Sequence, residues 1–187
     1  MFDRIISLPA PAQELIYPRA IWHYARGMAF LGKNENKKAQ LELNKLINLA
    51  ADSSLQQVTI WDINTTADLV LIAKKVLQAS LDRKQQKQQR ALTLFKEAVA
   101  IEDNLNYNEP PDWFFSVRHY LGDALLNDKK FNEAEQVFRE DLQIWENNIW
   151  ALEGLYKALL APHKTQEAKT IKLAKEKAGQ YANFSFQ

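Results

Sequence analysis

Small residues recur in this chain at a spacing of twelve positions. Gly27 precedes Ala39 by this distance, and Gly122 precedes Ala134 by the same distance. Apolar residues flank each of the four at helical intervals. Because a glycine on one helix and an alanine on the next let two backbones approach closely, this spacing predicts helix hairpins.

Two further hairpins follow less cleanly from the segments before Ala91 and Ala168. We therefore predict an all-α solenoid of about four helical hairpins with eight main helices, in a single domain over residues 1–187. The helices are expected near residues 17–33, 36–51, 66–85, 88–103, 111–128, 131–145, 148–161 and 165–182. The repeats lie near residues 17–51, 66–103, 111–145 and 148–182, after an N-terminal extension over 1–16 and with insertions at 52–65 and 104–110.

The spacing between hairpins is that of the tetratricopeptide (TPR) repeat. Ala134 and Ala168 are 34 residues apart, which is the length of one TPR unit. The earlier intervals exceed that length, and the excess falls on the two insertions. A two-helix repeat cannot bury its apolar face alone, so we expect the stacked hairpins to stabilise one another and the terminal helices to act as caps.

Three stretches resemble the C-terminal region of a bacterial TPR protein family of unassigned function. They are residues 22–29 (WHYARGMA), residues 100–118, which contain YNEPPDWFFSVR, and residues 134–142 (AEQVFREDL). The Tyr-x-Glu-Pro-Pro-x-Trp element is the most specific of them. The resemblance implies the TPR-like fold, and it implies that the chain is the C-terminal part of a larger protein.

Composition excludes several classes of function. The chain is 47% hydrophobic and 25% charged, with 24 Lys and Arg against 23 Asp and Glu. This balance does not favour nucleic acid or an anionic membrane as a partner. No apolar run approaches the roughly 18–20 residues that a membrane span needs, and no signal peptide is visible, so a cytoplasmic protein is expected. The absence of cysteine removes thiol chemistry and Cys-containing zinc sites.

The supply of catalytic groups is thin. His23, His119 and His163 fall in different repeats, and His23 has no second histidine or carboxylate at metal-ligand spacing. Gly-rich phosphate loops and hydrolase motifs are absent. We therefore expect no enzyme activity, cofactor or metal. The alternative is that the chain is a non-catalytic segment of a larger enzyme or small-molecule-binding protein.

A protein or peptide partner fits the fold better, because stacked hairpins form a concave surface lined by their first helices. The repeat frame predicts that this surface includes the following side chains: Tyr24, Met28, Val76, Ser80, Arg83, His119, Asp123, Asn127, Trp150, Glu153 and Lys157. Mixed aromatic, charged and amide groups suit an extended peptide. The competing interpretation is that the apolar members are packed in the core and that the charged members are merely solvated.

Two pairs within this set have the i, i+4 spacing at which helical side chains meet. His119 and Asp123 form a candidate peptide anchor or, as the weaker alternative, an acid–base pair, and otherwise an ordinary surface pair. Glu153 and Lys157 are expected to be an ordinary ion pair. The Tyr107–Trp113 element either braces an insertion or supplies aromatic anchors to a binding pocket.

Charge is unevenly distributed along the chain. Residues 74–96 hold seven basic side chains, whereas residues 133–146 hold five acids. The basic segment is predicted to be a solvated helix turn, and RNA or lipid binding is the weaker alternative. The opposite charges could instead guide self-association through the solenoid ends. Tyr181, Phe184 and Phe186 are expected to cover the last helix or to offer a partner site.

Overall fold

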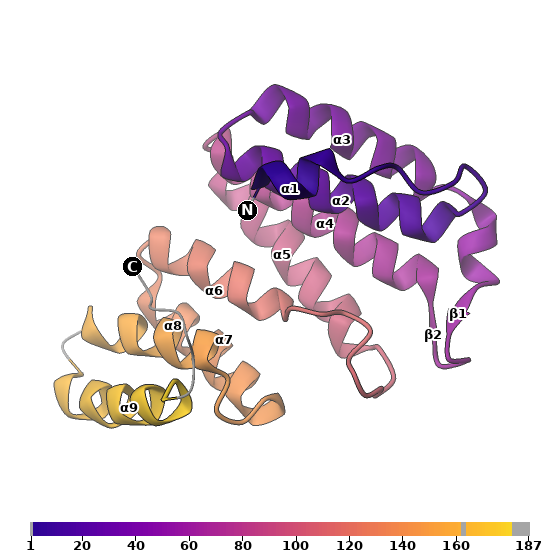
Figure 1. The fold of residues 1–187 in the computed structure, drawn as a ribbon. Helices are drawn as coiled ribbons and strands as arrows, with labels where there is room; N and C mark the ends of the chain where they lie inside the picture. The colour runs from indigo at the N-terminus through magenta and orange to yellow at the C-terminus, as the bar shows by residue number, and fades with distance from the viewer. Residues whose placement is uncertain (1, 162–163, 181–187) are drawn as a thin grey trace. The chain divides into compact units, whose positions relative to one another are not determined.

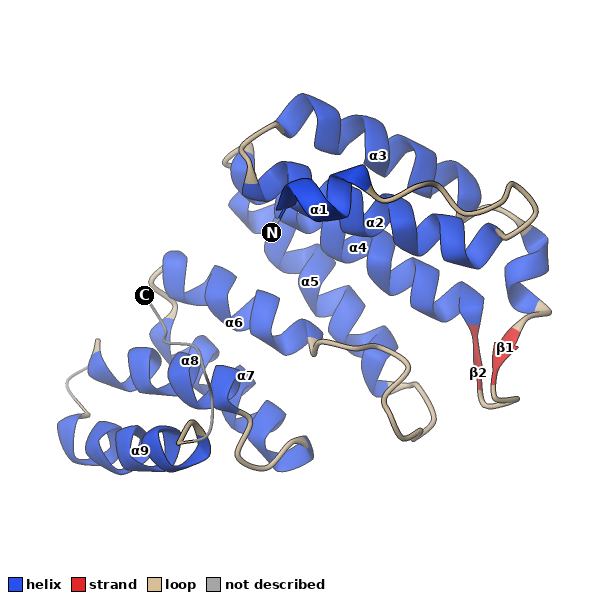
Figure 2. Ribbon diagram, viewed as in Figure 1, coloured by secondary structure: helices blue, strands red, loops and turns tan. Residues whose placement is uncertain are grey.

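The computed structural model describes residues 2–161 and 164–180 as a series of helices joined by short connections (Figure 1). The order of elements is α1 (Phe2–Ser7), α2 (Ile16–Gly32), α3 (Asn36–Leu49), a 3-10 helix (Ser53–Gln56), β1 (Thr59–Ile60), β2 (Asn64–Thr65), α4 (Thr66–Lys84), α5 (Gln88–Asp103), α6 (Val117–Asn127), α7 (Phe131–Ile144), α8 (Ile149–Leu160) and α9 (Thr165–Ala178). Helices dominate, and the two short strands form one antiparallel hairpin (Figure 2). The predicted all-α hairpin architecture is confirmed.

The chain divides into two compact units, Met1–Phe115 and Ser116–Gln187. In the first unit α2 packs on α3, α4 packs on α5, and α2 packs on α4. In the second unit α6, α7, α8 and α9 pack in sequence, and α6 also contacts α8. This is the pattern of stacked helix hairpins. The assignment of all 187 residues to one domain stays a prediction.

Three hairpins share one turn geometry. A left-handed residue ends the first helix in each, at Asn34, Gln86 and Lys129. The amide after it donates to a carbonyl five residues back, for example from Lys130 to Leu125 at 2.9 Å. This bond satisfies a carbonyl that the helix end leaves without a partner. The turns therefore use Asn, Gln and Lys where glycine is commonest, which explains why so few glycines suffice.

The first insertion is partly ordered into secondary structure. Asp52 caps the 3-10 helix, since its carboxylate accepts the Ser54 amide at 2.9 Å. Thr65 caps α4, and its hydroxyl accepts the Asp68 amide at 3.2 Å, as the Thr65-x-x-Asp68 motif predicts. Between them, β1 and β2 pair in the register Thr59 with Thr65 and Ile60 with Asn64.

The second insertion is longer than predicted. We expected a helix from residue 111, but α6 begins at Val117, and its cap is the Ser116 hydroxyl, which accepts the Arg118 amide at 3.3 Å. Residues 104–116 instead form an irregular loop. Asp112 is held there by the amide groups of Asn64 and Asn108, at 2.7 and 2.8 Å. These side-chain bonds compete with a helix start, so the two prolines lie in the loop.

The N-terminal segment lies along α2. The Trp22 indole donates to the Leu8 carbonyl at 3.2 Å, and the Arg26 guanidinium donates to the Ile6 carbonyl. Phe2 meets Gly32 at the far end of the helix, where an added methyl group would clash with its ring. Segment and helix therefore run in opposite directions. The segment covers one side of α2.

Phe138 lies at the centre of the second unit. Its side chain is buried on α7, and its ring contacts Gly122 of α6 and Gly154 of α8. A methyl group added to either glycine would lie 2.3 or 2.2 Å from the ring. The small residue at the first-helix position thus leaves room for the Phe138 ring, and three helices share this one aromatic side chain.

No helix in the two described stretches is long and apolar enough to cross a bilayer. Three aromatic residues near the C-terminus, Tyr181, Phe184 and Phe186, lie outside the described residues, as does His163.

Candidate functional site

The TPR frame predicts which face of the second unit is open. Residues 34 positions apart on α6 and α8 have matching environments: the pairs Leu121 and Leu155, Ala124 and Ala158, and Leu125 and Leu159 are all buried. Asp123 on α6 and its counterpart Lys157 on α8 are both exposed. Asn127 lies one turn beyond Asp123 and is also exposed. Consecutive first helices therefore present polar side chains in register.

His119 does not belong to this open face. Its side chain is buried, and its Nε2 atom lies 3.1 Å from the Asp141 carboxylate on α7. The hydrogen bond that joins the His119 side chain to α7 therefore runs to Asp141, and a contact with Asp123 stays a prediction. Asp123 instead accepts a hydrogen bond from the Asn127 side chain at 3.2 Å. An i, i+4 spacing shows which residues of one helix can touch. It does not show contacts with the second helix of the hairpin, where the fully buried Asp141 lies beside His119.

The His119 cluster positions Trp150. Asn148 donates to Asp141 at 3.1 Å, and its own side-chain oxygen accepts the Trp150 amide at 3.1 Å. Asn148 thereby caps α8 and joins its first turn to α6 and α7. The Trp150 side chain is 46% exposed. A large aromatic group is thus held at a fixed place at the start of α8.

Glu153 links α8 to α9. Lys175 donates to its carboxylate at 2.7 Å, and the predicted partner Lys157 lies 3.1 Å from it. Partial burial raises the pKa of Glu153, but the hydrogen bonds from these two lysines outweigh it, so the pKa lies below its usual value. Lys157 itself stays exposed. It is the member of this pair that a ligand would meet.

The corresponding face of the first unit is covered by the unit's own chain. Tyr24 is 3% exposed, and the Trp113 ring lies 5.5 Å from its ring. Phe114 completes the cluster at 6.5 Å from Tyr24. Met28 is half-buried beside it on α2. The insertion therefore fills the place where Tyr24 was expected to meet a ligand, and the Tyr24 side chain has little free surface.

Tyr107 and Trp113 have different environments. Trp113 is buried and braces the insertion, as one of the two predicted alternatives has it. Tyr107 is 78% exposed, and its hydroxyl donates to the Glu109 carboxylate. Phe114 also stays largely exposed. The element thus combines one anchoring ring with two rings open to a partner.

A buried polar cluster in the first unit was missed from the sequence. His23 Nδ1 lies 2.5 Å from the Glu42 carboxylate, and Arg26 contacts the same group at 3.2 Å. Burial lowers the pKa of His23, although the hydrogen bond that the Glu42 carboxylate accepts from the imidazole opposes the shift. The spacing from His23 to Glu42 is set by hairpin geometry, so no local motif reveals it. The described residues contain no group of three or more metal-ligating side chains.

The basic segment is partly paired. Lys75 donates to Glu97 at 2.6 Å, and Arg90 lies 3.1 Å from the buried carboxylate of Asp82. These contacts join α4 to α5. These two ion pairs are consistent with the predicted role of the basic segment as a solvated surface of the helices.

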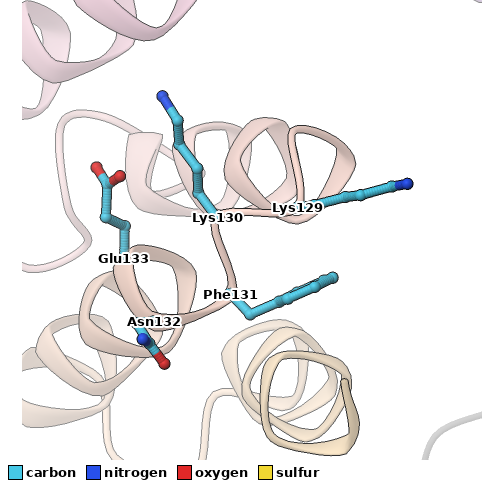
Figure 3. A pocket seen from close by; sticks show the side chains of 5 residues that line it. All are labelled: Lys129, Lys130, Phe131, Asn132 and Glu133. Carbon is cyan, nitrogen blue, oxygen red and sulfur yellow. The ribbon is translucent and has the colours of Figure 1, made fainter. Parts of the chain in front are cut away.

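A shallow hollow of about 420 Å³ lies at the turn between α6 and α7 (Figure 3). Its lining is five consecutive residues, Lys129 to Glu133, and the two lysine side chains point away from each other. A surface formed by one turn, with its charges diverging, does not converge on a ligand.

The geometry defines a helical-repeat protein of the TPR-like class. The chain is similar to a crystal structure of nearly identical TPR-like repeats from a kinesin light chain-like protein of Podosopora anserina, with a TM-score of 0.60 and 14% identity. The match covers 98% of this chain and 86% of the other. A single-substitution variant of the same protein matches with the same TM-score and identity. At this identity the likeness shows the fold alone.

No protein-family model and no curated protein matches the sequence. The predicted TPR-like fold is confirmed. The bacterial family and the C-terminal position within it stay predictions.

Proposed function

We propose that this protein is a scaffold that binds an extended segment of a partner protein on the α6–α8 face of its second unit. The observation that carries the proposal is the row of exposed side chains on consecutive first helices: Asp123, Asn127, Trp150 and Lys157. A fold of this class typically serves as a non-catalytic scaffold for protein interactions.

The chemistry of this row suits a peptide. Trp150 supplies a large apolar surface on a rigid helix start, which is how aromatic anchors commonly act at interfaces. Asp123 and Lys157 supply opposite charges at equivalent positions of the two helices, and they can orient the charged groups of a bound chain. The side-chain oxygen of Asn127, whose NH2 group donates to Asp123, can accept a hydrogen bond from a peptide N–H. His119 and Glu153 support the face by fixing α6, α8 and α9.

Selection from a random peptide library against the full chain tests the proposal. The affinity of each selected peptide is then measured by isothermal titration calorimetry for the wild type and for Trp150→Ala. We expect the dissociation constant to rise about tenfold or more, because truncating an aromatic hot spot commonly costs about 2 kcal/mol of binding free energy.

The matched control is Leu173→Ala, which removes an exposed side chain (67% exposed) from α9 in the same unit. It should leave the affinity unchanged. If library selection yields no binder, or if Trp150→Ala and Asp123→Ala both bind the selected peptides like the wild type, the α6–α8 face is not the binding surface.

A further inference from the structure

One end of the first unit joins the two insertions through hydrogen bonds. The Asn64 amide donates to the Asn106 carbonyl at 2.8 Å and to the Asp112 carboxylate at 2.7 Å. In return, the Asn106 backbone amide donates to the Asn64 side-chain oxygen at 2.8 Å. Asn64 is buried. The β1–β2 hairpin and the 104–116 loop therefore form one fixed junction, although they are about 40 residues apart in sequence.

Aromatic side chains project from this junction into solvent. Trp61 at the hairpin tip is 80% exposed, Tyr107 is 78% exposed and Phe114 is 67% exposed. Val58 and Ile63 of the hairpin are also exposed. The Phe114 ring packs against the ring of buried Trp113, with centroids 5.2 Å apart. This contact holds Phe114 in place on its inner side.

Trp61 gains little stabilisation from burial, because it is 80% exposed. Its backbone is left-handed (φ 52°), as is that of Asp62 (φ 60°), and together they form the hairpin turn. Glycine and asparagine are the residues that favour such a turn, and a bulky side chain makes it less stable by about 1 kcal/mol. Because four-fifths of the Trp61 side chain is in water, burial does not compensate for that cost. A bulky residue kept at such a position points to a role in binding.

The junction is strongly acidic. Residues 52–68 and 102–117 contain seven Asp and Glu and no Lys, Arg or His, although the chain as a whole is balanced. Asp62 adjoins Trp61, and Glu109 accepts a hydrogen bond from the Tyr107 hydroxyl. That hydrogen bond, with the charge of Glu109, raises the pKa of Tyr107 and keeps the phenol neutral. Exposed aromatic side chains therefore lie here beside carboxylates, with Asp62 next to Trp61 and Glu109 next to Tyr107.

We infer that the Trp61–Tyr107–Phe114 junction binds an extended protein segment that carries arginine or lysine side chains. The faces of tryptophan and tyrosine attract such cations, most strongly when the rings are partly desolvated, and nearby carboxylates add to the attraction. The inference rests on the proposed function, that of a protein-binding scaffold, and adds a second surface with a stated partner chemistry. The surface lies entirely within Met1–Phe115.

Fluorescence anisotropy of the full chain tests this site. The probe is a fluorescein-labelled nine-residue peptide of alternating glycine and arginine, and its comparison is the same peptide with glutamate in place of arginine. We expect the arginine peptide to bind with a dissociation constant below 1 mM at 50 mM NaCl. The affinity should fall as salt is raised to 300 mM, because salt screens exposed charges. The glutamate peptide should not bind.

The informative variant is Trp61→Gly, because glycine suits the turn. It should weaken binding of the arginine peptide about tenfold while leaving the urea midpoint of unfolding equal to or above that of the wild type. Asp62→Asn keeps the turn and should weaken binding by a smaller factor. Leu41→Ala, which removes an exposed apolar side chain (60% exposed) from α3 of the same unit, is the matched control and should bind the arginine peptide normally.

The two proposals fail separately. Equal binding of the glutamate peptide, no binding of the arginine peptide at 1 mM, or an unchanged affinity in Trp61→Gly would overturn the inference and leave the α6–α8 proposal standing. Conversely, loss of library-selected peptides in Trp61→Gly but not in Trp150→Ala would move the main binding surface to the junction.

Discussion

At the scale of single residues, the buried groups set the behaviour with pH. His23 is 3% exposed, and its Nδ1–H faces the Glu42 carboxylate across 2.5 Å. Burial lowers the pKa of His23 despite that carboxylate, and Lys45 and Arg19 lower it further. The imidazole is therefore held in its neutral form in the folded protein, and Glu42 is shared between it and Arg26.

This arrangement predicts acid sensitivity below neutral pH. Because the pKa of His23 is lower in the folded state than the unfolded value of about 6.5, the unfolded chain takes up the proton first as pH falls. The contribution of His23 to the free energy of unfolding should therefore be constant above about pH 7. Below about pH 6.5 it should decrease as the pH falls. Urea denaturation at pH 7.5, 6.5 and 5.5 measures it.

The variant His23→Gln should lose this dependence, because glutamine can donate to Glu42 but does not titrate. The pKa values of the Glu135 and Glu153 carboxyl groups lie below their usual range. The effect of these two groups on stability therefore changes only at lower pH and does not obscure the test. A wild type and a His23→Gln variant that lose stability in parallel between pH 7.5 and 5.5 would contradict the assignment.

At the scale of elements, one aromatic ring determines how closely three helices approach. Phe138 cannot move away from Gly122 on α6 without meeting Gly154 on α8, because both glycines contact the end of its ring. In the first unit, the same role falls to Leu77 of α4, whose methyl groups lie where a Cβ atom at Gly27 would be. Gly27 and Gly122 are therefore required because a larger side chain at either position would clash with Leu77 or Phe138 of the adjacent helix.

Gly122→Ala should destabilise the protein by about 2 kcal/mol in denaturant unfolding. Overpacking a core commonly costs about 1–3 kcal/mol, and the better helix propensity of alanine offsets about 1 kcal/mol of a larger penalty. Truncating the ring in the double variant Gly122→Ala/Phe138→Leu should remove most of the clash. The double-mutant cycle with Phe138→Leu alone therefore yields a favourable coupling energy.

Gly179→Ala is the matched control for this cycle. An added methyl group would lie 2.8 Å from the tip of the half-buried Ile149 side chain and 3.3 Å from the Lys175 carbonyl oxygen, so its main close contact is the end of a flexible side chain. Its effect should stay within about 0.5 kcal/mol. A Gly122→Ala variant as stable as the wild type would show that Phe138 is not confined by the two glycines.

At the scale of the whole molecule, stability is divided between two units with separate cores. Helical repeats gain stability mainly from nearest neighbours, so a local change affects the repeats around it most. Leu77 in the first unit and Leu155 in the second are both almost fully buried, and they offer matched sites for truncation. Each Leu→Ala change should cost about 2–5 kcal/mol.

Native-state hydrogen exchange should localise these effects. Leu155→Ala should accelerate exchange of amides in α6–α9 much more than in α2–α5, and Leu77→Ala should do the reverse. Mass spectrometry of peptic fragments resolves the two sets. Uniform acceleration across all helices in both variants would mean that the chain unfolds as a single cooperative unit.

Helices were the best-predicted part of the molecule. The bounds of α4 and α5 agree with expectation to within a residue, because apolar periodicity and capping residues such as Thr65 are local signals. The start of α6 was wrong by six residues. There the Asn64–Asp112 bond, formed with the other insertion, favours a loop.

The candidate surfaces were harder to predict. Asp123 and Lys157, which the 34-residue repeat frame assigned to the concave face, are exposed, and their part in binding stays a prediction. The repeat frame did not show that Trp113 covers Tyr24, or that His119 pairs with Asp141. Both contacts join residues that are 22 or more positions apart, and several partners are equally possible until the helices pack.

The sequence by itself determined the hairpins, because the spacing of small and apolar residues fixes which helix faces can approach. Only the tertiary structure decided which of the candidate side chains remain available to a partner. Whether a side chain is buried or exposed depends on whether a polar group has a hydrogen-bond partner in the core and whether an aromatic ring has space to pack there. Both conditions depend on residues that are distant in the sequence. Trp113 is buried in the core, whereas Trp61, Tyr107 and Trp150 are exposed.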